Sequence, residues 1–165
     1  EQTAHVFCMG TCENAKDKFK YIGVDDCVSA SKLAGGAKLC SNGCLGFGSC
    51  MEVCKFNAVS VKNGIAKIDS DKCTACGMCV KKCPKHLISI IPKKSRVFAN
   101  CSNIEKGATA SKECLVSCIG CRLCEKQCEH DAIHVLNNHA VIDYSKCTAC
   151  GKCSEKCPKG VIAVL

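Results

Sequence analysis

Short runs of apolar residues, separated by polar turns and cysteine-rich loops, recur along the chain. Two of these runs flank Asn63-Gly64, a pair typical of a two-residue hairpin turn, and they predict a β-hairpin over 58–68. The same arrangement around Asn137-Asn138 predicts a second hairpin. The chain should therefore contain two similar units rather than one long-range sheet.

Two further apolar runs, 87–90 and 161–164, predict the closing strand of each unit. A short helix is expected after the fourth cysteine of each cysteine-rich loop, with a hairpin or a closing strand after it. No apolar run reaches the length of about eighteen residues that a membrane-spanning helix needs, so we expect no span in this sequence. Glu1 at its start leads us to expect a longer natural chain.

Composition changes this picture, because 21 of the 165 residues are cysteine. The hydrophobic share of 47% counts them, and without them it falls to roughly 35%, below the usual globular value. With five Phe, two Tyr and no Trp, ordinary burial can hardly offset the entropy of so many loops. We therefore expect the cysteines to supply cross-links, and an ordinary enzyme core is excluded.

The spacing of the cysteines indicates what they bind. The segments 73–84 and 147–158 both read C-x2-C-x2-C-x3-C-P. In bacterial ferredoxins three cysteines of this run hold one iron-sulfur cube and the fourth holds a second. A zinc site needs two C-x2-C pairs separated by a longer insert, and a disulfide framework is typical of small secreted proteins. Iron-sulfur clusters are therefore the favoured interpretation.

A shift of 74 residues aligns the chain with itself from Cys27, which meets Cys101, to the last cysteine run. The predicted fold class is α+β, with two tandem bacterial 2[4Fe-4S] ferredoxin-like modules and a cysteine-rich amino-terminal extension. The predicted boundaries are 1–26 for the extension, 27–91 for module 1, 92–100 for a linker and 101–165 for module 2.

Pairing each cysteine run with the fourth cysteine of the other run gives three complete ligand sets. The second cluster of module 1 is assigned to Cys73, Cys76, Cys79 and Cys54. The clusters of module 2 are assigned to Cys118, Cys121, Cys124 and Cys157, and to Cys147, Cys150, Cys153 and Cys128. No separate catalytic residues are expected.

The first cluster of module 1 lacks one ligand, because Phe47 stands where module 2 has Cys121. Cys44, Cys50 and Cys83 remain, and Cys40 is the nearest candidate for the fourth corner. A three-iron cluster is the alternative. Cys8, Cys12 and Cys27 predict part of a fifth cluster, whose fourth ligand is left open among Cys40, Cys101 and Cys114. Four to five [4Fe-4S] clusters are thus expected.

The residues also match a known family. Segments 8–14, 21–27 and 35–50, together with Ser117-Cys118-Ile119-Gly120-Cys121, resemble the B subunit of the Rnf complex in its longer, cluster-rich form. The resemblance covers essentially the whole chain, and its amino-terminal block is the specific part. Where Pro is commoner after the fourth cysteine of the first run, this chain has Lys55 and Glu129.

The resemblance implies an electron-transfer subunit of a membrane-bound, ion-translocating ferredoxin:NAD+ oxidoreductase. Its expected donor is soluble ferredoxin, its expected partners are the other subunits of the complex, and its expected location is the cytoplasmic face of the cell membrane. Members usually carry an amino-terminal membrane helix and a further small cluster domain, and neither is in this sequence. No direct NAD binding and no nucleic acid are expected.

The formal net charge of +8 first suggests an acidic partner such as nucleic acid. Each oxidised cube with four thiolates carries a charge of about −2, so four or five contribute about −8 to −10. The basic side chains are then compensation for buried negative clusters. The alternatives are a free polyferredoxin, a cluster subunit of another redox complex such as a hydrogenase, and a zinc-stapled structural or nucleic-acid-binding module.

Overall fold

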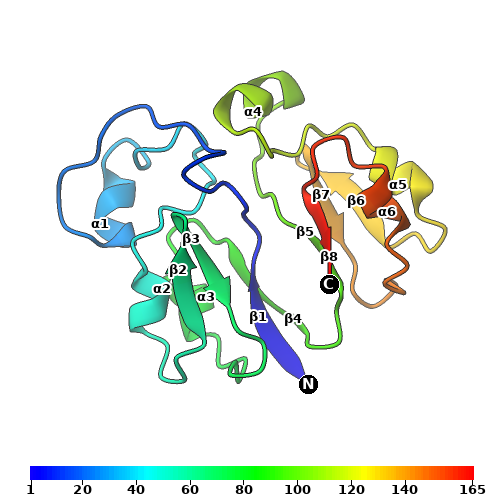
Figure 1. Cartoon of the computed structure of the whole chain (residues 1–165), viewed down its shortest axis with the longest axis horizontal. Helices are drawn as coiled ribbons and strands as arrows, with labels where there is room; N and C mark the ends of the chain where they lie inside the picture. Colours follow the sequence, from blue (N-terminus) through cyan, green and yellow to red (C-terminus); the bar gives the residue numbers. More distant parts are fainter.

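The computed structural model describes all residues 1–165, and it consists of two similar modules that lie side by side (Figure 1). Each module contains one β-hairpin, one pair of outer strands and short helices. The elements of the first module are β1 (Gln2–Val6), α1 (Cys27–Lys32), α2 (Ser49–Glu52), β2 (Val59–Lys62), β3 (Ile65–Ile68), α3 (Met78–Lys82) and β4 (Ile88–Pro92). Those of the second are β5 (Val97–Ala99), α4 (Gly107–Glu113), α5 (Leu123–Gln127), β6 (Ile133–Leu136), β7 (His139–Ile142), α6 (Lys152–Glu155) and β8 (Ile162–Val164).

Both predicted hairpins are confirmed. Strands β2 and β3 pair antiparallel from Val59↔Ile68 to Lys62↔Ile65, and β6 and β7 pair in the same way. Asn63 and Gly64 turn the first hairpin with φ angles of 51° and 77°, which is the left-handed conformation that such a turn requires. Asparagine adopts this conformation more readily than most side chains, which explains the second turn as well.

The predicted extension and linker both contain a strand. Strand β1 pairs antiparallel with β4, so residues 2–6 complete module 1 instead of standing outside it. Strand β5 pairs with β8 in the equivalent way, so residues 97–99 of the predicted linker belong to module 2. The 74-residue repeat does not align these two strands, because the segments that follow them differ in length between the modules.

The helices of the cysteine-rich loops begin earlier than predicted. Helix α3 contains Cys79 and ends before Cys83, whose backbone is extended. Helix α2 likewise contains Cys50 and ends before Cys54. Pro84 explains the end of α3, because a proline disfavours helical conformation in the residue before it. The third cysteine of each run therefore lies inside a helix, and the fourth lies beyond its end.

Each module has its own small hydrophobic core, and cysteines form part of both. Eight buried residues make up the first core, among them Cys50 and Cys79, and nine make up the second, among them Cys118 and Cys124. Most of the partly buried side chains packed against these cores are also cysteines. The cysteine-rich loops therefore pack directly on the hairpins and outer strands.

Gly46 lies where a cysteine-rich loop touches the turn of the first hairpin. A Cβ atom there would lie 2.5 Å from the carbonyl oxygen of Gly64, and the φ of Gly46 is 77°. Gly46→Ala should therefore destabilise module 1 by about 1–3 kcal/mol, because the backbone must move apart. Gly77→Ala is the matched control, since Gly77 has a φ of 76° with no atom within 4 Å of the added Cβ.

The measurement is the guanidinium midpoint at which the cysteine-bound chromophore of each variant is lost under anaerobic conditions. Both alanines suffer the same conformational cost at positive φ. A midpoint for Gly46→Ala that is no lower than that for Gly77→Ala would contradict the packing argument.

Candidate metal centres

The predicted metal-binding loops bend sharply before each helix. Gly48, Gly77 and Gly151 stand at the amino ends of α2, α3 and α6 with φ angles of 79°, 76° and 77°. Glycine adopts this left-handed conformation without strain because it has no Cβ. The bend folds the loop back over the helix, so cysteines that are close in sequence face the same cavity.

In module 2, one predicted ligand set lines a single cavity. Cys128 comes from the end of α5, while Cys147, Cys150 and Cys153 come from the loop before α6 and from α6 itself. Apolar side chains of the neighbouring strands form part of the remaining wall. The structure brings these four cysteines together as the sequence predicts.

The other predicted set of module 2 is also assembled. Burial raises the pKa of Cys124 to about 12, and the nearby thiols of Cys118, Cys121 and Cys157 contribute to the rise. In module 1, burial raises the pKa of Cys79, with additional contributions from the thiols of Cys73 and Cys76. Their predicted partner Cys54 packs against the same core.

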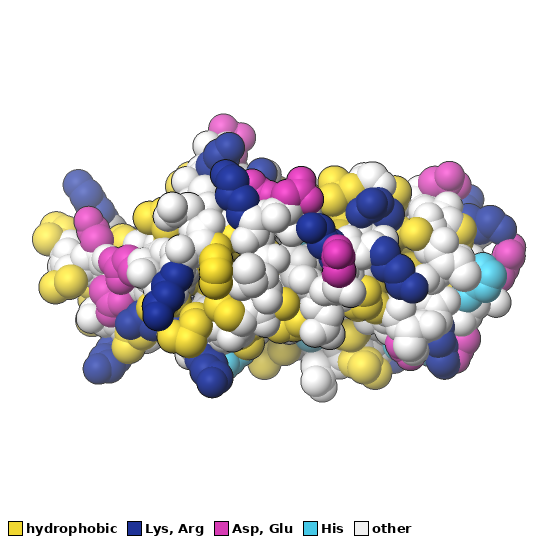
Figure 2. Space-filling model, turned by 90° about the horizontal axis from the view of Figure 1, so that it is seen from below, with side chains coloured by type: hydrophobic (Ala, Val, Ile, Leu, Met, Phe, Trp, Pro, Cys, Tyr) yellow, Lys and Arg dark blue, Asp and Glu magenta, His cyan; other side chains and the backbone are white.

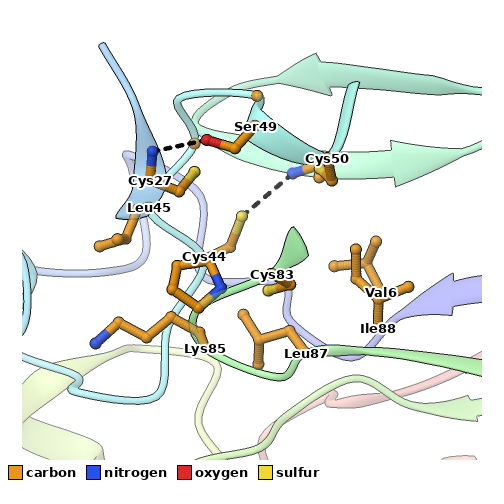
Figure 3. Close-up of a pocket in the computed structure, with 14 residues that line it drawn as sticks. Val6, Cys27, Cys44, Leu45, Ser49, Cys50, Cys83, Lys85, Leu87 and Ile88 are labelled. Carbon is orange, nitrogen blue, oxygen red and sulfur yellow. Dashed lines mark hydrogen bonds between the residues drawn. The ribbon is translucent and has the colours of Figure 1, made fainter. Parts of the chain in front are cut away.

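The remaining site of module 1 is lined by Cys27, Cys44, Cys50 and Cys83 (Figure 3). Burial raises the pKa of Cys50 to about 12, and the thiols of the other three cysteines add to the effect. Cys40, the predicted fourth corner, does not line this cavity. The structure therefore places Cys27 at the corner for which Cys40 was expected.

Hydrogen bonds hold Cys27 in this position at the start of α1. The backbone N–H of Cys27 donates to Ser49 Oγ at 2.8 Å, and the Ser49 hydroxyl donates to Asp26 Oδ1 at 2.8 Å. Asp26 also caps α1 by accepting from the backbone N–H of Ser29. These bonds lower the pKa of Asp26 to about 2, and the bond from the Ser29 backbone has the largest effect. Helix α1 is thus fastened to the start of α2, beside Cys50.

A further cavity lies between the two modules, and Cys8, Cys40, Cys101 and Cys114 line it. Cys12 is exposed and is not among the lining residues. Cys27, which was predicted to bind the fifth cluster together with Cys8 and Cys12, lines the module 1 cavity instead. The structure thus separates the trio predicted for a fifth cluster, and it leaves only Cys8 beside the candidates for the fourth ligand.

The donor set of these sites consists of thiols, and it fits iron-sulfur clusters. Backbone N–H groups donate to cysteine sulfurs, as at Cys54 and Cys128, which accept from Ala58 and Ala132 at 3.4 Å. Such bonds tune the potential of a cluster. No three His, Cys, Asp or Glu side chains converge closely enough to hold one metal ion. The thiols surround cavities instead, as a cube with irons at separate corners requires.

Known families match both cysteine-rich regions of the chain. A family described as "4Fe-4S dicluster domain" matches residues 117–161, and one described as "4Fe-4S binding domain" matches residues 66–89. The chain therefore contains two 4Fe-4S ferredoxin-type domains, one in each module. These matches confirm the predicted fold class and the type of cofactor, although they do not set the number of clusters at four or five.

Relatives of known name extend the similarity to nearly the whole chain. The B subunit of the proton-translocating ferredoxin:NAD(+) oxidoreductase complex of Clostridium ljungdahlii is 47% identical over 99% of this chain and 59% of its own length. The B subunit of the Na(+)-translocating ferredoxin:NAD(+) oxidoreductase complex of Acetobacterium woodii is 44% identical over 99% of this chain and 49% of its own length. The B subunit of an ion-translocating oxidoreductase complex of Methanosarcina acetivorans is 37% identical over 95% of this chain and 60% of its own length. The resemblance to the B subunit of the Rnf complex is confirmed.

The chain spans about half to three-fifths of the length of these relatives. None of its helices is both long enough and apolar enough to span a lipid bilayer. On the face seen in Figure 2, lysine and arginine side chains are spread out, with acidic side chains among them, and they form no continuous basic patch.

Proposed function

We propose that this chain is the electron-carrying part of the B subunit of an ion-translocating ferredoxin:NAD+ oxidoreductase complex. The observation that carries the proposal is the identity of 44–47% to two such subunits over 99% of the chain. The sets of cysteines that converge in both modules also support the proposal. The chain takes part in an oxidoreductase without holding a substrate site of its own.

Clusters bound by these thiols would supply reversible one-electron transfer. The chain's own residues hold each site in a largely apolar wall and donate backbone N–H groups to the sulfurs. The geometry supports four ligand sets. They are Cys27, Cys44, Cys50 and Cys83; Cys54, Cys73, Cys76 and Cys79; Cys118, Cys121, Cys124 and Cys157; and Cys128, Cys147, Cys150 and Cys153.

The exposed cysteines suggest where electrons enter and leave. Cys76 of module 1 and Cys121 and Cys150 of module 2 are exposed, whereas the cysteines inside α2, α3 and α5 are buried. An exposed ligand brings a site close to the surface, where a partner can approach it. We propose soluble reduced ferredoxin as the donor and the other subunits, at the cytoplasmic face of the membrane, as the acceptor.

Anaerobic stopped-flow mixing with reduced ferredoxin tests this proposal. We expect the visible absorption of the reconstituted chain to bleach rapidly, with ferredoxin reoxidised in equal electron number. A ferredoxin whose iron has been replaced by gallium is the control and should give no bleaching. A colourless chain that contains zinc without iron or sulfide, or a chain that reduced ferredoxin leaves coloured, would contradict the proposal.

A further inference from the structure

The cavity between the modules receives two cysteines from each of them. Cys8 follows β1 and Cys40 precedes the first cysteine-rich loop of module 1, while Cys101 follows β5 and Cys114 ends α4 in module 2. A Cβ atom added at Gly10 would lie 3.6 Å from Cys8 Sγ and 3.5 Å from Cys114 Sγ. Thiols from the two modules thus face the same space.

The strand register shows that Cys8 and Cys101 are equivalent positions of the two modules. In the outer strand pairs, Val6 stands opposite Ile88 and Ala99 stands opposite Ile162, which is 74 residues further on. Each cysteine follows two residues later. The cavity is therefore lined by two symmetry-related pairs of thiols.

The surroundings of these two sulfurs repeat as well. Cys8 Sγ accepts from the backbone N–H of Cys44 at 3.5 Å, and Cys101 Sγ accepts from that of Cys118 at 3.2 Å. Cys44 and Cys118 are again 74 residues apart. Because each donor is itself assigned to a ferredoxin-type site, the cavity lies directly between one such site of each module.

Buried polar groups in the wall indicate an occupant that carries negative charge. Lys38 is only 7% exposed, and its Nζ donates to the carbonyl oxygen of Gly10 at 2.7 Å, but no carboxylate pairs with it. A buried ammonium group is costly unless an opposite charge compensates it. Ser117 Oγ also lines the cavity and is buried without a hydrogen-bond partner, so its hydroxyl group is free to donate to a negatively charged occupant.

The size of the cavity agrees with this occupant. It is of the same size as the cavity in module 2 lined by Cys128, Cys147, Cys150 and Cys153. That cavity lies within the region matched by the 4Fe-4S dicluster family. Both cavities present four thiols, and the one between the modules adds a buried cation and a hydroxyl group with a free hydrogen.

We propose that a fifth [4Fe-4S] cluster binds between the modules through Cys8, Cys40, Cys101 and Cys114, with Lys38 as its positive counter-charge. Each thiol loses its proton to solvent as its sulfur bonds one iron, and the cluster keeps its oxidation state. The cluster joins the two modules covalently, and it connects the redox sites of one module with those of the other. Cys12 stays a free thiol.

Iron and sulfide analysis of the anaerobically reconstituted chain tests the proposal. The expected content is about 20 irons per chain, at four per cube, falling to about 16 in the variant Cys8→Ala/Cys101→Ala. Cys12→Ala is the matched control and should keep about 20. The remaining iron of the double variant also shows that both modules still fold.

A wild-type content of about 16 irons, or a double variant that keeps the wild-type content, would overturn the proposal. So would a loss of four irons in Cys12→Ala. Reduction by ferredoxin does not enter this test, so its failure and that of the proposed function are distinguishable.

The role of Lys38 has its own readout. Lys38→Met removes a positive charge beside the proposed cluster, and it should lower the midpoint potential of that cluster more than that of any other, because the reduced form carries the larger negative charge. A redox titration followed by electron paramagnetic resonance measures the shift. Lys62→Met, at an exposed position of β2, is the control. Unchanged midpoint potentials in Lys38→Met would show that Lys38 is not the counter-charge of this cluster.

Discussion

Removal of iron from the loaded protein will unfold both modules. Their cores contain eight and nine buried residues, and two members of each are cysteines assigned as ligands. Without the metal, the remaining apolar contacts cannot offset the conformational entropy of 165 residues that lie mostly in loops. Structural metal sites commonly contribute the folding free energy of such domains, which then unfold when the metal is withdrawn.

Charge acts in the same direction. The chain without clusters carries a formal net charge of +8 at pH 7, and self-repulsion destabilises its compact state. Bound clusters, at about −2 each, would neutralise this charge. Metal removal therefore withdraws the cross-links and the counter-charges in one step, which makes this the largest effect we expect.

Far-ultraviolet circular dichroism and amide hydrogen exchange, before and after anaerobic treatment with a chelator, provide the measurement. We expect the amides of the β2–β3 and β6–β7 hairpins to lose protection, and to regain it when iron and sulfide are restored. A reductant is kept present, so that disulfides cannot form in the stripped chain. Hairpin amides that stay protected without iron would show that the apolar cores suffice alone.

Local patterns made much of this fold predictable. The Asn63-Gly64 turn lies between two short apolar runs, so the hairpin follows from neighbouring residues. The cysteine runs of both modules likewise fix their own loop geometry, because a C-x2-C spacing and a left-handed glycine act within a few residues. The two predicted sets of module 2 are accordingly brought together in the structure, and in module 1 Cys73, Cys76 and Cys79 lie close together while Cys54 packs against the same core.

The cysteines that the structure groups differently from the predicted sets depend on long-range structure. Cys8 and Cys40 are 32 positions apart, whereas Cys101 and Cys114 are 13 apart, so a comparison without gaps cannot align both pairs. It aligned Cys27 with Cys101 instead, although Cys27 lies in the longer segment of module 1. The pairing of β1 with β4 and of β5 with β8 shows instead that Cys8 and Cys101 are equivalent. The sequence does not predict this equivalence, because no local pattern indicates which strand will pair with the edge of another.

The site of Phe47 shows how module 1 compensates for its missing ligand. Phe47 lies between Gly46 and Gly48, with φ angles of 77° and 79°, and Cys121 lies between Gly120 and Arg122, with φ angles of 63° and 61°. The backbone at the two positions is therefore alike. A cysteine at position 47 should point its sulfur where Cys121 does, while Cys27 now reaches that corner from α1.

This likeness predicts a rescue. Cys27→Ser should leave the site of Cys44, Cys50 and Cys83 with only three cysteine ligands. Its cluster should convert to the three-iron form, at about one such cluster per chain. Cys27→Ser/Phe47→Cys should restore the four-iron form, because the new thiol supplies the missing corner. Electron paramagnetic resonance of the oxidised protein counts three-iron clusters, and Mössbauer spectroscopy confirms the iron type.

Cys40→Ser distinguishes this assignment from the one first expected for the same corner. Since Cys40 lines the cavity between the modules, its loss should disturb that site, and adding Phe47→Cys should not repair the damage. The assignment of Cys27 would fail if Cys27→Ser kept all its four-iron clusters while Phe47→Cys rescued Cys40→Ser. Rescue of Cys27→Ser and not of Cys40→Ser therefore separates the two sites, because Gly46 and Gly48, on either side of position 47, line the cavity that contains Cys44, Cys50 and Cys83 and do not line the cavity between the modules.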